Sequence, residues 1–251
     1  MEFADSREAN PINPPLSMVI NFLYSLYDKG VKYSGIGTAR SAISSFVNIC
    51  SGGKIDIGNS VLVKKFMKGV FNKRPALPKY SSTWNPDIVL SYLTLLGSNI
   101  TLLQLSQKVC MLLLLLTGQR GQSIHLLKLS DICINDTGIE IQFSNILKHT
   151  KPGRHQGPIM LKAFVENRSI CIVSCLREYI KRTEALRGTE NRLFITTQPP
   201  FKAVARATIS RWTRTIMRKA GLNVDQFKPH STRAAATSAA KDKGIPLHCI
   251  M

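Results

Sequence analysis

The sequence predicts a mostly helical α+β protein that is divided into two domains, and three observations support this prediction. Three helix-length segments with apolar stripes precede a stretch of proline and polar residues at 73–86. Three short strand-like segments then follow one another between residues 130 and 161, separated by turn residues. Helical patterns flank these strands on both sides in the sequence, which favours one small antiparallel sheet packed among helices.

The first domain is expected at residues 16–74, after a flexible lead of residues 1–15. Its first helix, within 17–30, ends at Gly30, because glycine readily adopts the left-handed conformation that terminates many helices. The second helix, over 37–50, has an apolar stripe that consists of Ala39, Ile43, Phe46, Val47 and Cys50.

The third helix, over 61–71, is expected to bury Val63, Phe66 and Val70 on one face. The opposite face of this helix is basic and carries Lys64, Lys65 and Lys68. A linker rich in proline and polar residues is then expected at residues 75–84.

The second domain is expected at residues 85–251. Asn85 and Pro86 start a helix, and a strongly apolar core helix follows over 101–117. The strands are assigned to 130–134, 138–143 and 158–161, with turns at Asn135-Asp136 and Pro152-Gly153. Further helices are expected at 172–187, 205–220 and 231–243, and a short strand at 193–196.

The balance of charge indicates a polyanionic partner. The chain has 34 Lys and Arg residues against 15 Asp and Glu residues, a net charge of +19. Nucleic acid is the commonest partner for such an excess, although a soluble protein with a basic surface has the same signature. The positive residues are spread over many segments, which disfavours an amphipathic helix that binds membranes.

Six cysteines are present without a C-x-x-C pair, and no histidine is followed by a second ligand at i+4. This pattern predicts a reducing compartment, no disulfide framework and no metal site. The N-terminal segment lacks the apolar region of a secretory signal. The apolar run 111–116 is too short to span a bilayer and is typical of a core helix, so no membrane partner is expected.

Two basic residues stand where the chain is expected to turn. Arg120 follows a T-G pair at the end of the core helix, where a cation would also satisfy carbonyl groups at the helix C-terminus. Lys151 precedes a P-G turn, with Lys148 three residues earlier, and a lysine at a hairpin tip is often only solvated. Each residue alone therefore allows an ordinary structural interpretation.

The stretch PHSTRAAATSAA, residues 229–240, predicts a helix that starts at or just after His230. His230 and Arg233 would share one face of its first turn, which suits an anion; the alternative is a capping role with a structural histidine.

A helix within 205–221 has an apolar stripe and a basic stripe. The basic stripe is either a solvated face or a row of phosphate contacts. The stripes consist of Ile209, Trp212 and Ile216 and of Arg211, Arg214 and Arg218.

Taken together, these segments resemble the tyrosine recombinases, the phage-integrase family. The resemblance rests on TGQRGQSIHLLKLSDI, on a lysine before a hairpin turn, and on HSTR, whose histidine comes 110 residues after Arg120. The stretches TGQRGQS, KPGRHQ and HSTRAAATSAA are most similar to recombinases of DIRS-type retrotransposons of eukaryotes. The resemblance covers nearly the whole chain and implies a helical core-binding domain at 16–74 and a catalytic domain at 85–251.

The resemblance implies DNA breaking and rejoining without a metal or another cofactor. In this family a tyrosine attacks the scissile phosphate and forms a 3′-phosphotyrosyl link. Arg120 and Arg233 would hold the non-bridging oxygens of that phosphate. Lys151, with Lys148 as the alternative, would give a proton to the departing 5′ oxygen, and His230 would assist proton transfer or bind the phosphate.

The sequence departs from the family pattern at two places. Ser123 stands three positions after Arg120, where the family usually has an acidic residue. No Trp or Tyr follows Arg233, and all six tyrosines precede the H-x-x-R box. The chain is therefore expected to be truncated before the nucleophilic tyrosine and to be inactive as an enzyme by itself.

The leading hypothesis is a DNA-binding recombinase of a mobile element, which binds double-stranded DNA, self-associates on it and acts in the nucleus. The alternative is a non-catalytic DNA-binding remnant or a domesticated protein. A basic scaffold that binds RNA or another partner is a third hypothesis, which the aromatic content of 7% disfavours because RNA readers stack bases on aromatic side chains. Candidate DNA phosphate contacts are Arg40, Lys64, Lys65, Lys68, Arg154, Arg211 and Arg214.

Overall fold

The structure is a computed structural model that describes most of the chain. The described residues are 10–75, 77, 82–97, 99–147, 150–153 and 155–245. The chain divides into two compact units, Met1–Lys79 and Tyr80–Met251, which are called the first and the second unit below. The division falls inside the segment 75–84 that the sequence assigns to a linker.

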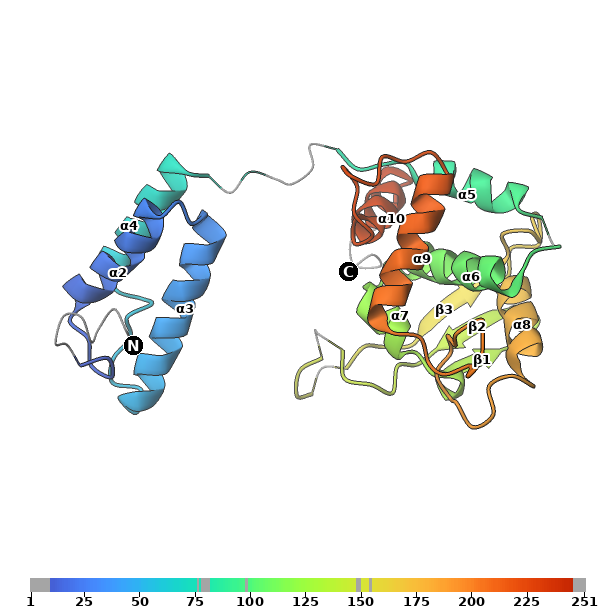
Figure 1. The fold of residues 1–251 in the computed structure, drawn as a ribbon, viewed down its shortest axis with the longest axis horizontal. Helices are drawn as coiled ribbons and strands as arrows, with labels where there is room; N and C mark the ends of the chain where they lie inside the picture. Colours follow the sequence, from blue (N-terminus) through green and yellow to red (C-terminus); the bar gives the residue numbers. More distant parts are fainter. Residues whose placement is uncertain are drawn as a thin grey trace. The chain divides into compact units, whose positions relative to one another are not determined.

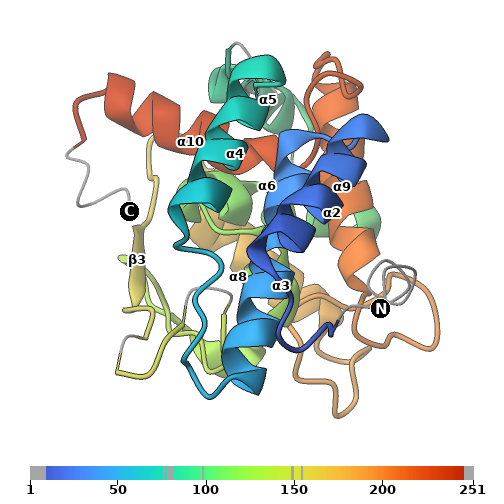
Figure 2. The ribbon, with the colours of Figure 1, turned by 90° about the vertical axis from the view of Figure 1, so that its left-hand side faces the viewer.

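The described residues of the first unit form three helices that all contact one another (Figure 2): α2 (Leu16–Asp28), α3 (Tyr33–Cys50) and α4 (Val61–Lys73). As predicted, the first helix ends just before Gly30, which has a φ of 79°. The helices enclose a small core that consists of Val19, Leu23, Ile36, Val47, Ile57, Val63, Met67 and Val70.

The apolar stripe predicted for α3 is wrong in part. Phe46 is 43% exposed and Cys50 is exposed as well, whereas Ile36, which lies outside the predicted helix, is buried. The helix begins four residues earlier than predicted, so Ile36 and Val47, about three turns apart, face the core together. Phe46 is rotated by about 100° from its neighbour Val47, and Cys50 is the last residue of the helix.

The prediction for α4 is confirmed in its main feature, the segregation of apolar and basic faces. Val63 and Val70 are buried, Phe66 is half-buried, and Met67, which the sequence did not single out, is buried too. The opposite face is exposed and carries Lys64, Lys65 and Lys68.

The second unit is built around α6 (Leu102–Thr117), in which every residue from 105 to 115 is buried. The helix has well-defined ends. The Thr101 hydroxyl accepts a hydrogen bond from the Gln104 backbone N–H, and the Gln104 side chain accepts one from the Thr101 N–H. Gly118, with φ 59°, ends the helix in the left-handed conformation.

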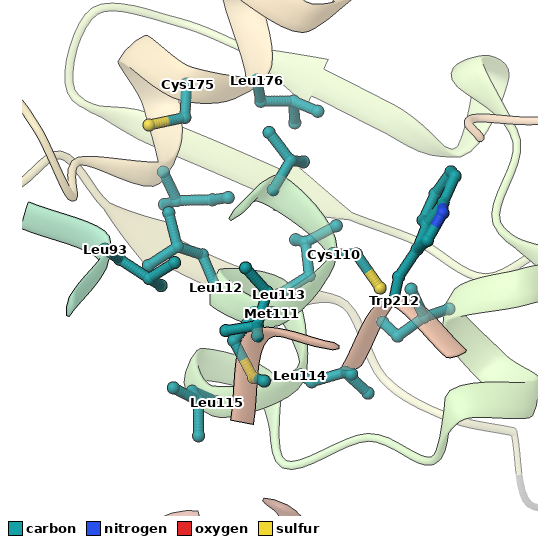
Figure 3. Close-up of a cluster of buried hydrophobic side chains, with 14 of the residues drawn as sticks. Leu93, Cys110, Met111, Leu112, Leu113, Leu114, Leu115, Cys175, Leu176 and Trp212 are labelled. Atoms are coloured by element: carbon teal, nitrogen blue, oxygen red, sulfur yellow. The ribbon is translucent and has the colours of Figure 1, made fainter. Parts of the chain in front are cut away.

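Four helices contact α6 directly (Figure 1), namely α7 (Gly121–Leu126), α8 (Ile172–Thr183), α9 (Arg206–Lys219) and α10 (Ser231–Asp242). Figure 3 shows the core that results. Side chains of α6 gather with Leu93 of α5 (Pro86–Leu95), with Cys175 and Leu176 of α8 and with Trp212 of α9. The central helix thus fixes the positions of the helices that surround it.

Three strands form an antiparallel sheet in the order β1 (Ile132–Ile134), β2 (Gly138–Ile141) and β3 (Ile159–Lys162). Ile139 of β2 is buried and pairs with Ile134 on one side and Leu161 on the other. The Asn135 side chain closes the first turn by accepting hydrogen bonds from the backbone N–H groups of Thr137 and Gly138. The predicted α+β fold with one small antiparallel sheet is confirmed.

Three segments differ from the prediction. Residues 121–126 form α7, which is too short and too rich in polar residues to show a helical periodicity in the sequence. The segment 193–196 joins no strand of the sheet; Ile195 makes only an isolated bridge with Ala203. Lys151 lies outside the three strands of the sheet, in the long connection between β2 and β3, where it forms a β-bridge just before the Pro152-Gly153 turn.

The described part of the chain contains no helix that is long and apolar enough to cross a membrane. Its five cysteines are free thiols. Cys110, Cys171 and Cys175 are buried, and Cys50 and Cys133 are exposed. Burial raises the pKa of the Cys110 thiol to about 12, so this thiol behaves as an apolar core group at neutral pH.

Lys108 is a charged residue inside the core of the second unit. It is only 1% exposed, and its Nζ donates a hydrogen bond to the Gly97 carbonyl at 3.4 Å. Burial lowers the pKa of Lys108, while the neighbouring Cys175 raises it to a smaller extent. The charged form is therefore disfavoured in the folded protein, and Lys108 lowers the free energy of unfolding at neutral pH.

We expect Lys108→Met to raise the Tm of the second unit at pH 7 by roughly 2–8 °C. The substitution removes a buried charge that destabilises the folded state by about 1–2 kcal/mol. The folded pKa lies below the unfolded value of about 10.4, so the cost disappears as pH rises through the folded pKa towards that value. Calorimetry from pH 7 to pH 10 measures this difference. Lys181→Met on the exposed face of α8 is the matched control, and an equal gain in both variants would contradict the explanation.

Candidate active site

Arg120 lies between two helices at one end of the core. The chain leaves α6 at Gly118, and Arg120 is the N-terminal cap residue of α7, with φ −77° and ψ 149°. Its backbone carbonyl accepts hydrogen bonds from the N–H groups of Ser123 (2.8 Å) and Ile124 (3.3 Å). This anchoring of the backbone holds Arg120 at the start of α7.

His230 and Arg233 are held by the first turn of α10. The helix begins at Ser231, as predicted, and His230 is its N-terminal cap residue without a capping hydrogen bond from its side chain. The Thr232 hydroxyl donates to the Pro229 carbonyl at 2.8 Å. The predicted i, i+3 relation between the two residues is therefore preserved at the helix start.

A buried tryptophan fixes the same turn from the other side. The indole Nε1 of Trp84 donates a hydrogen bond to the Ser231 hydroxyl at 2.9 Å, and both residues are less than 5% exposed. Ser231 is the neighbour of His230 in the chain, so this contact ties the start of the second unit to the residues that carry the charge. No local sequence pattern predicts this contact, because 147 residues separate the two partners.

The side chains of Arg120, His230 and Arg233 line a single cavity of about 560 Å³. One wall is formed by α9, of which Arg206, Ile209, Ser210 and Thr213 face the cavity. The described residues that line the cavity include three arginines and no aspartate or glutamate. The described part of the lining thus concentrates positive charge and contains no acidic residue, as a site for an anion requires.

The two predicted arginines influence each other in this cavity. Burial first, and then the charge of Arg120, lower the pKa of Arg233 from its ordinary value. Arg233 nevertheless remains protonated at neutral pH, because the guanidinium group loses its proton only at very high pH. Arg233 is half-buried, and Arg120 and His230 are exposed to solvent, so the cavity is open to a large ligand.

The structure does not bring Lys151 to this cavity. Lys151 is exposed and is absent from the described cavity lining, and Gly153 after it has φ 71° in a turn. Lys148, the alternative, lies outside the described residues. Ser123 is buried in α7, so the position where the family has a carboxylate contributes none to Arg120.

The candidate DNA contacts have different surroundings. Arg211 of α9 is exposed, whereas Arg214 is half-buried and forms an ion pair with Asp225 at 3.2 Å. Arg40 of α3 is half-buried in the first unit, where the lysines of α4 are exposed. Arg154 lies outside the described residues. The apolar stripe predicted for α9 is confirmed, since Ile209, Trp212 and Ile216 are buried.

Arg206 and Gln119 are among the cavity residues that were not predicted from the sequence. Arg206 opens α9 one turn before the basic stripe that the sequence shows, and Gln119 precedes Arg120 as an ordinary polar residue. Gln119 is only 8% exposed, and its Oε1 has no hydrogen-bond partner. A signal for Arg206 was available, because it begins the same helix face as Ile209 and Ser210.

The described residues contain no group of three or more His, Cys, Asp or Glu side chains close enough to hold a metal ion. Of the tyrosines in the described part, none lines the cavity. Tyr179 is fully buried, and its hydroxyl accepts a hydrogen bond from the Ile195 backbone N–H at 3.1 Å. Tyr80 lies outside the described residues.

Comparison with known protein families places this geometry in context. The model of the phage integrase family matches residues 93–251, which include all three arginines of the cavity and His230. The chain belongs to the phage integrase family. A search of curated protein sequences gave no significant match.

Solved structures similar to this integrase-family chain show the same fold at low sequence identity. The XerH site-specific recombinase bound to its difH substrate has 19% identity and a TM-score of 0.66, over 99% of this chain and 67% of that chain. The Tn1549 transposon integrase in complex with transposon right end DNA has 15% identity and a TM-score of 0.63, over 94% and 75%. A lambda integrase dimer bound to a COC′ core site has 17% identity and a TM-score of 0.52, over 92% and 72%. The chain thus spans about two thirds of the XerH chain.

The bond between Trp84 and Ser231 can be tested by a double-mutant cycle. We expect Trp84→Phe and Ser231→Ala each to lower the free energy of unfolding, with a coupling energy of about 1 kcal/mol because both remove the same buried hydrogen bond. Urea unfolding of the two single variants and the double variant measures the coupling. Additive losses, within about 0.3 kcal/mol, would show that the bond does not hold the turn.

Proposed function

We propose that this integrase-family chain is a DNA-binding, tyrosine-recombinase-like protein of a mobile element, and that the ligand of its cavity is a DNA phosphodiester. The observation that carries this proposal is the convergence of Arg120, His230 and Arg233 on one cavity whose described lining has no acidic residue. The net charge of +19 and the DNA in the Tn1549 integrase complex support the same ligand.

The two arginines suit a phosphodiester that is attacked at phosphorus. Negative charge builds on the two non-bridging oxygens during the attack, and each guanidinium can donate two parallel hydrogen bonds to them. Arg120 and Arg233 approach these oxygens from different helices, which holds the phosphate in a defined orientation. His230 assists proton transfer or binds the phosphate at the start of α10, where the helix dipole also favours an anion.

Lys151 has to reach the cavity from the connection between β2 and β3. That connection is tied to the end of α7 by Asn145, whose Nδ2 donates a hydrogen bond to the Leu126 carbonyl at 3.0 Å. Because α7 begins at the cavity with Arg120, the base of the connection lies only one short helix away. In the proposed mechanism Lys151 gives its proton to the departing 5′ oxygen of the bound DNA.

A second candidate function is DNA binding without cleavage. It is favoured by the absence of a tyrosine from the described lining of the cavity, because a 3′-phosphotyrosyl link requires one. The arginines would then bind DNA phosphates without activating them. This candidate predicts the same dependence of affinity on salt but no covalent product.

Three further features of the proposal rest on similarity. The mobile-element origin is inferred from TGQRGQS and the related stretches and from the fold shared with the Tn1549 transposon integrase. Self-association on DNA is inferred from the lambda integrase, which is a dimer on its core site. A nuclear location is inferred only from the resemblance to recombinases of eukaryotic retrotransposons.

We expect the chain to bind duplex DNA with an affinity that falls steeply with salt, since each neutralised phosphate releases about 0.9 counterion. Arg233→Ala should weaken binding roughly tenfold and reduce the salt slope by about 1. Fluorescence anisotropy on a labelled duplex, at salt concentrations between about 50 and 200 mM, measures both the affinity and the salt slope.

Arg177→Ala is the matched control for this experiment. Arg177 is a surface residue of α8 that pairs with Asp136 at 2.8 Å and does not belong to the cavity lining. The Arg177→Ala variant should bind DNA with the same affinity and the same salt slope as the unmodified chain. Equal weakening by Arg177→Ala and Arg233→Ala would show that overall charge, and not the cavity, binds the DNA.

Cleavage chemistry can be tested with the protein expressed from its complete open reading frame. On a nicked duplex that carries a site selected from random DNA, we expect a covalent protein–DNA adduct that survives denaturing electrophoresis. Arg120→Ala should abolish it, because the charge of the transition state loses half of its guanidinium support. Tight binding of the selected site without any adduct would reject the recombinase and leave the binding-only candidate.

A further inference from the structure

Arg206 is a basic residue of the cavity to which the family resemblance gives no role. It is the first residue of α9 and lines the same cavity as Arg120 and Arg233. With Ile209 and Ser210 it forms the continuous face of α9 on that wall, because positions i, i+3 and i+4 share one side of a helix. Arg206 therefore faces the ligand space from a third helix, separate from α7 and α10.

The charge of Arg206 acts on a group other than the pair described above, and this group lies outside the described cavity lining. After burial, the charge of Arg120 is the cause that lowers the pKa of Arg233. The charge of Arg206 acts on His125, whose pKa is lowered by burial first, then by Arg192 and, less strongly, by Arg206. His125 comes five residues after Arg120 in α7, a rise of about 7 Å along the helix.

One phosphodiester does not account for three guanidinium groups. It carries a single negative charge and two non-bridging oxygens, which Arg120 and Arg233 can saturate with paired hydrogen bonds. Arg206 adds a third positive charge in a lining whose described residues include no acidic side chain. Since each DNA strand carries one charge per nucleotide, the adjacent phosphate is the nearest further anion that a bound strand would offer.

Two features of the wall around Arg206 also fit a ligand. Ala205 caps α9 without a side-chain hydrogen bond, and the first turn of this 14-residue helix contains no acidic residue, so its positive end is not neutralised by the chain. Gln119, which is 8% exposed, presents an Oε1 atom without a hydrogen-bond partner in the same lining. Buried acceptors are rarely left unpaired. A phosphodiester has no hydrogen-bond donor, so the partner of this atom would be a water molecule that accompanies the DNA backbone.

We propose that Arg206 binds the phosphate adjacent to the one held by Arg120 and Arg233 on the same DNA strand. This inference rests on the proposed function, because it takes the strand in the cavity to be DNA. With two consecutive phosphates held from three helices, the strand cannot rotate about the reacting phosphate. Arg206 thereby sets the direction in which the backbone crosses the cavity.

The test compares Arg206→Ala, Arg120→Ala and the double variant on one labelled duplex over a series of salt concentrations. If the two arginines bind separate phosphates, each single variant should lose roughly tenfold in affinity and about 0.9 in salt slope. The double variant should lose about twice as much slope, since distant, independent contacts add. Arg206→Lys should keep the slope, because the charge remains, and lose part of the affinity with the paired hydrogen bonds.

The outcomes separate this inference from the proposed function. If Arg206→Ala binds like the control Arg177→Ala while Arg120→Ala is weakened, Arg206 has no DNA contact and the inference is wrong. If the losses of Arg206→Ala and Arg120→Ala do not add, the two residues share one phosphate and the inference is wrong in that respect. If no variant differs from the control, the proposed function itself fails. Thermal unfolding of each variant verifies that the second unit remains folded.

Discussion

The burial of α6 is the constraint on which the rest of the second unit depends. Its residues 105–115 are shielded on every side, and α7, α8, α9 and α10 all pack on it. Arg120 follows directly from the end of this helix, while His230 and Arg233 come from a helix that packs against it. A buried core helix therefore brings together charged groups that are far apart in the sequence. Because the core is closely packed, it also holds the helices that line the cavity in fixed positions.

The cavity combines partial burial with three arginines and no acidic residue among the described residues that line it, an arrangement that favours a bound anion. Arg233 is partly desolvated beside Arg120, and both effects lower its pKa. Contacts that lie away from the charge, such as the buried hydrogen bond between Trp84 and Ser231, stabilise the turn that holds Arg233. An anion that enters the cavity would relieve the repulsion between arginines that α7 and α10 already hold in place, which is a form of electrostatic preorganisation.

Much of the fold could be predicted from local patterns, whereas the site could be predicted only in part. Capping signals at Asn85 and Thr101 and the start of the helix at Ser231 were readable because they depend on neighbouring residues. The exposure of Phe46 could not be predicted in this way, since small differences in helix phase decide which side of an apolar stripe faces the core. The role of Trp84 depends on a contact with a distant segment, and no local pattern reports it. The position of Arg206 on the same helix face as Ile209 and Ser210 was visible locally, but the cavity that this face lines was not.

The central claim is that a DNA phosphate occupies the cavity between Arg120 and Arg233. It is tested most directly by an experimental structure of the chain bound to duplex DNA. The account predicts one phosphodiester whose non-bridging oxygens lie at about 2.7–2.9 Å from guanidinium nitrogens of both residues, with His230 beside them. DNA bound on another face of the second unit, with both arginines facing solvent, would contradict it.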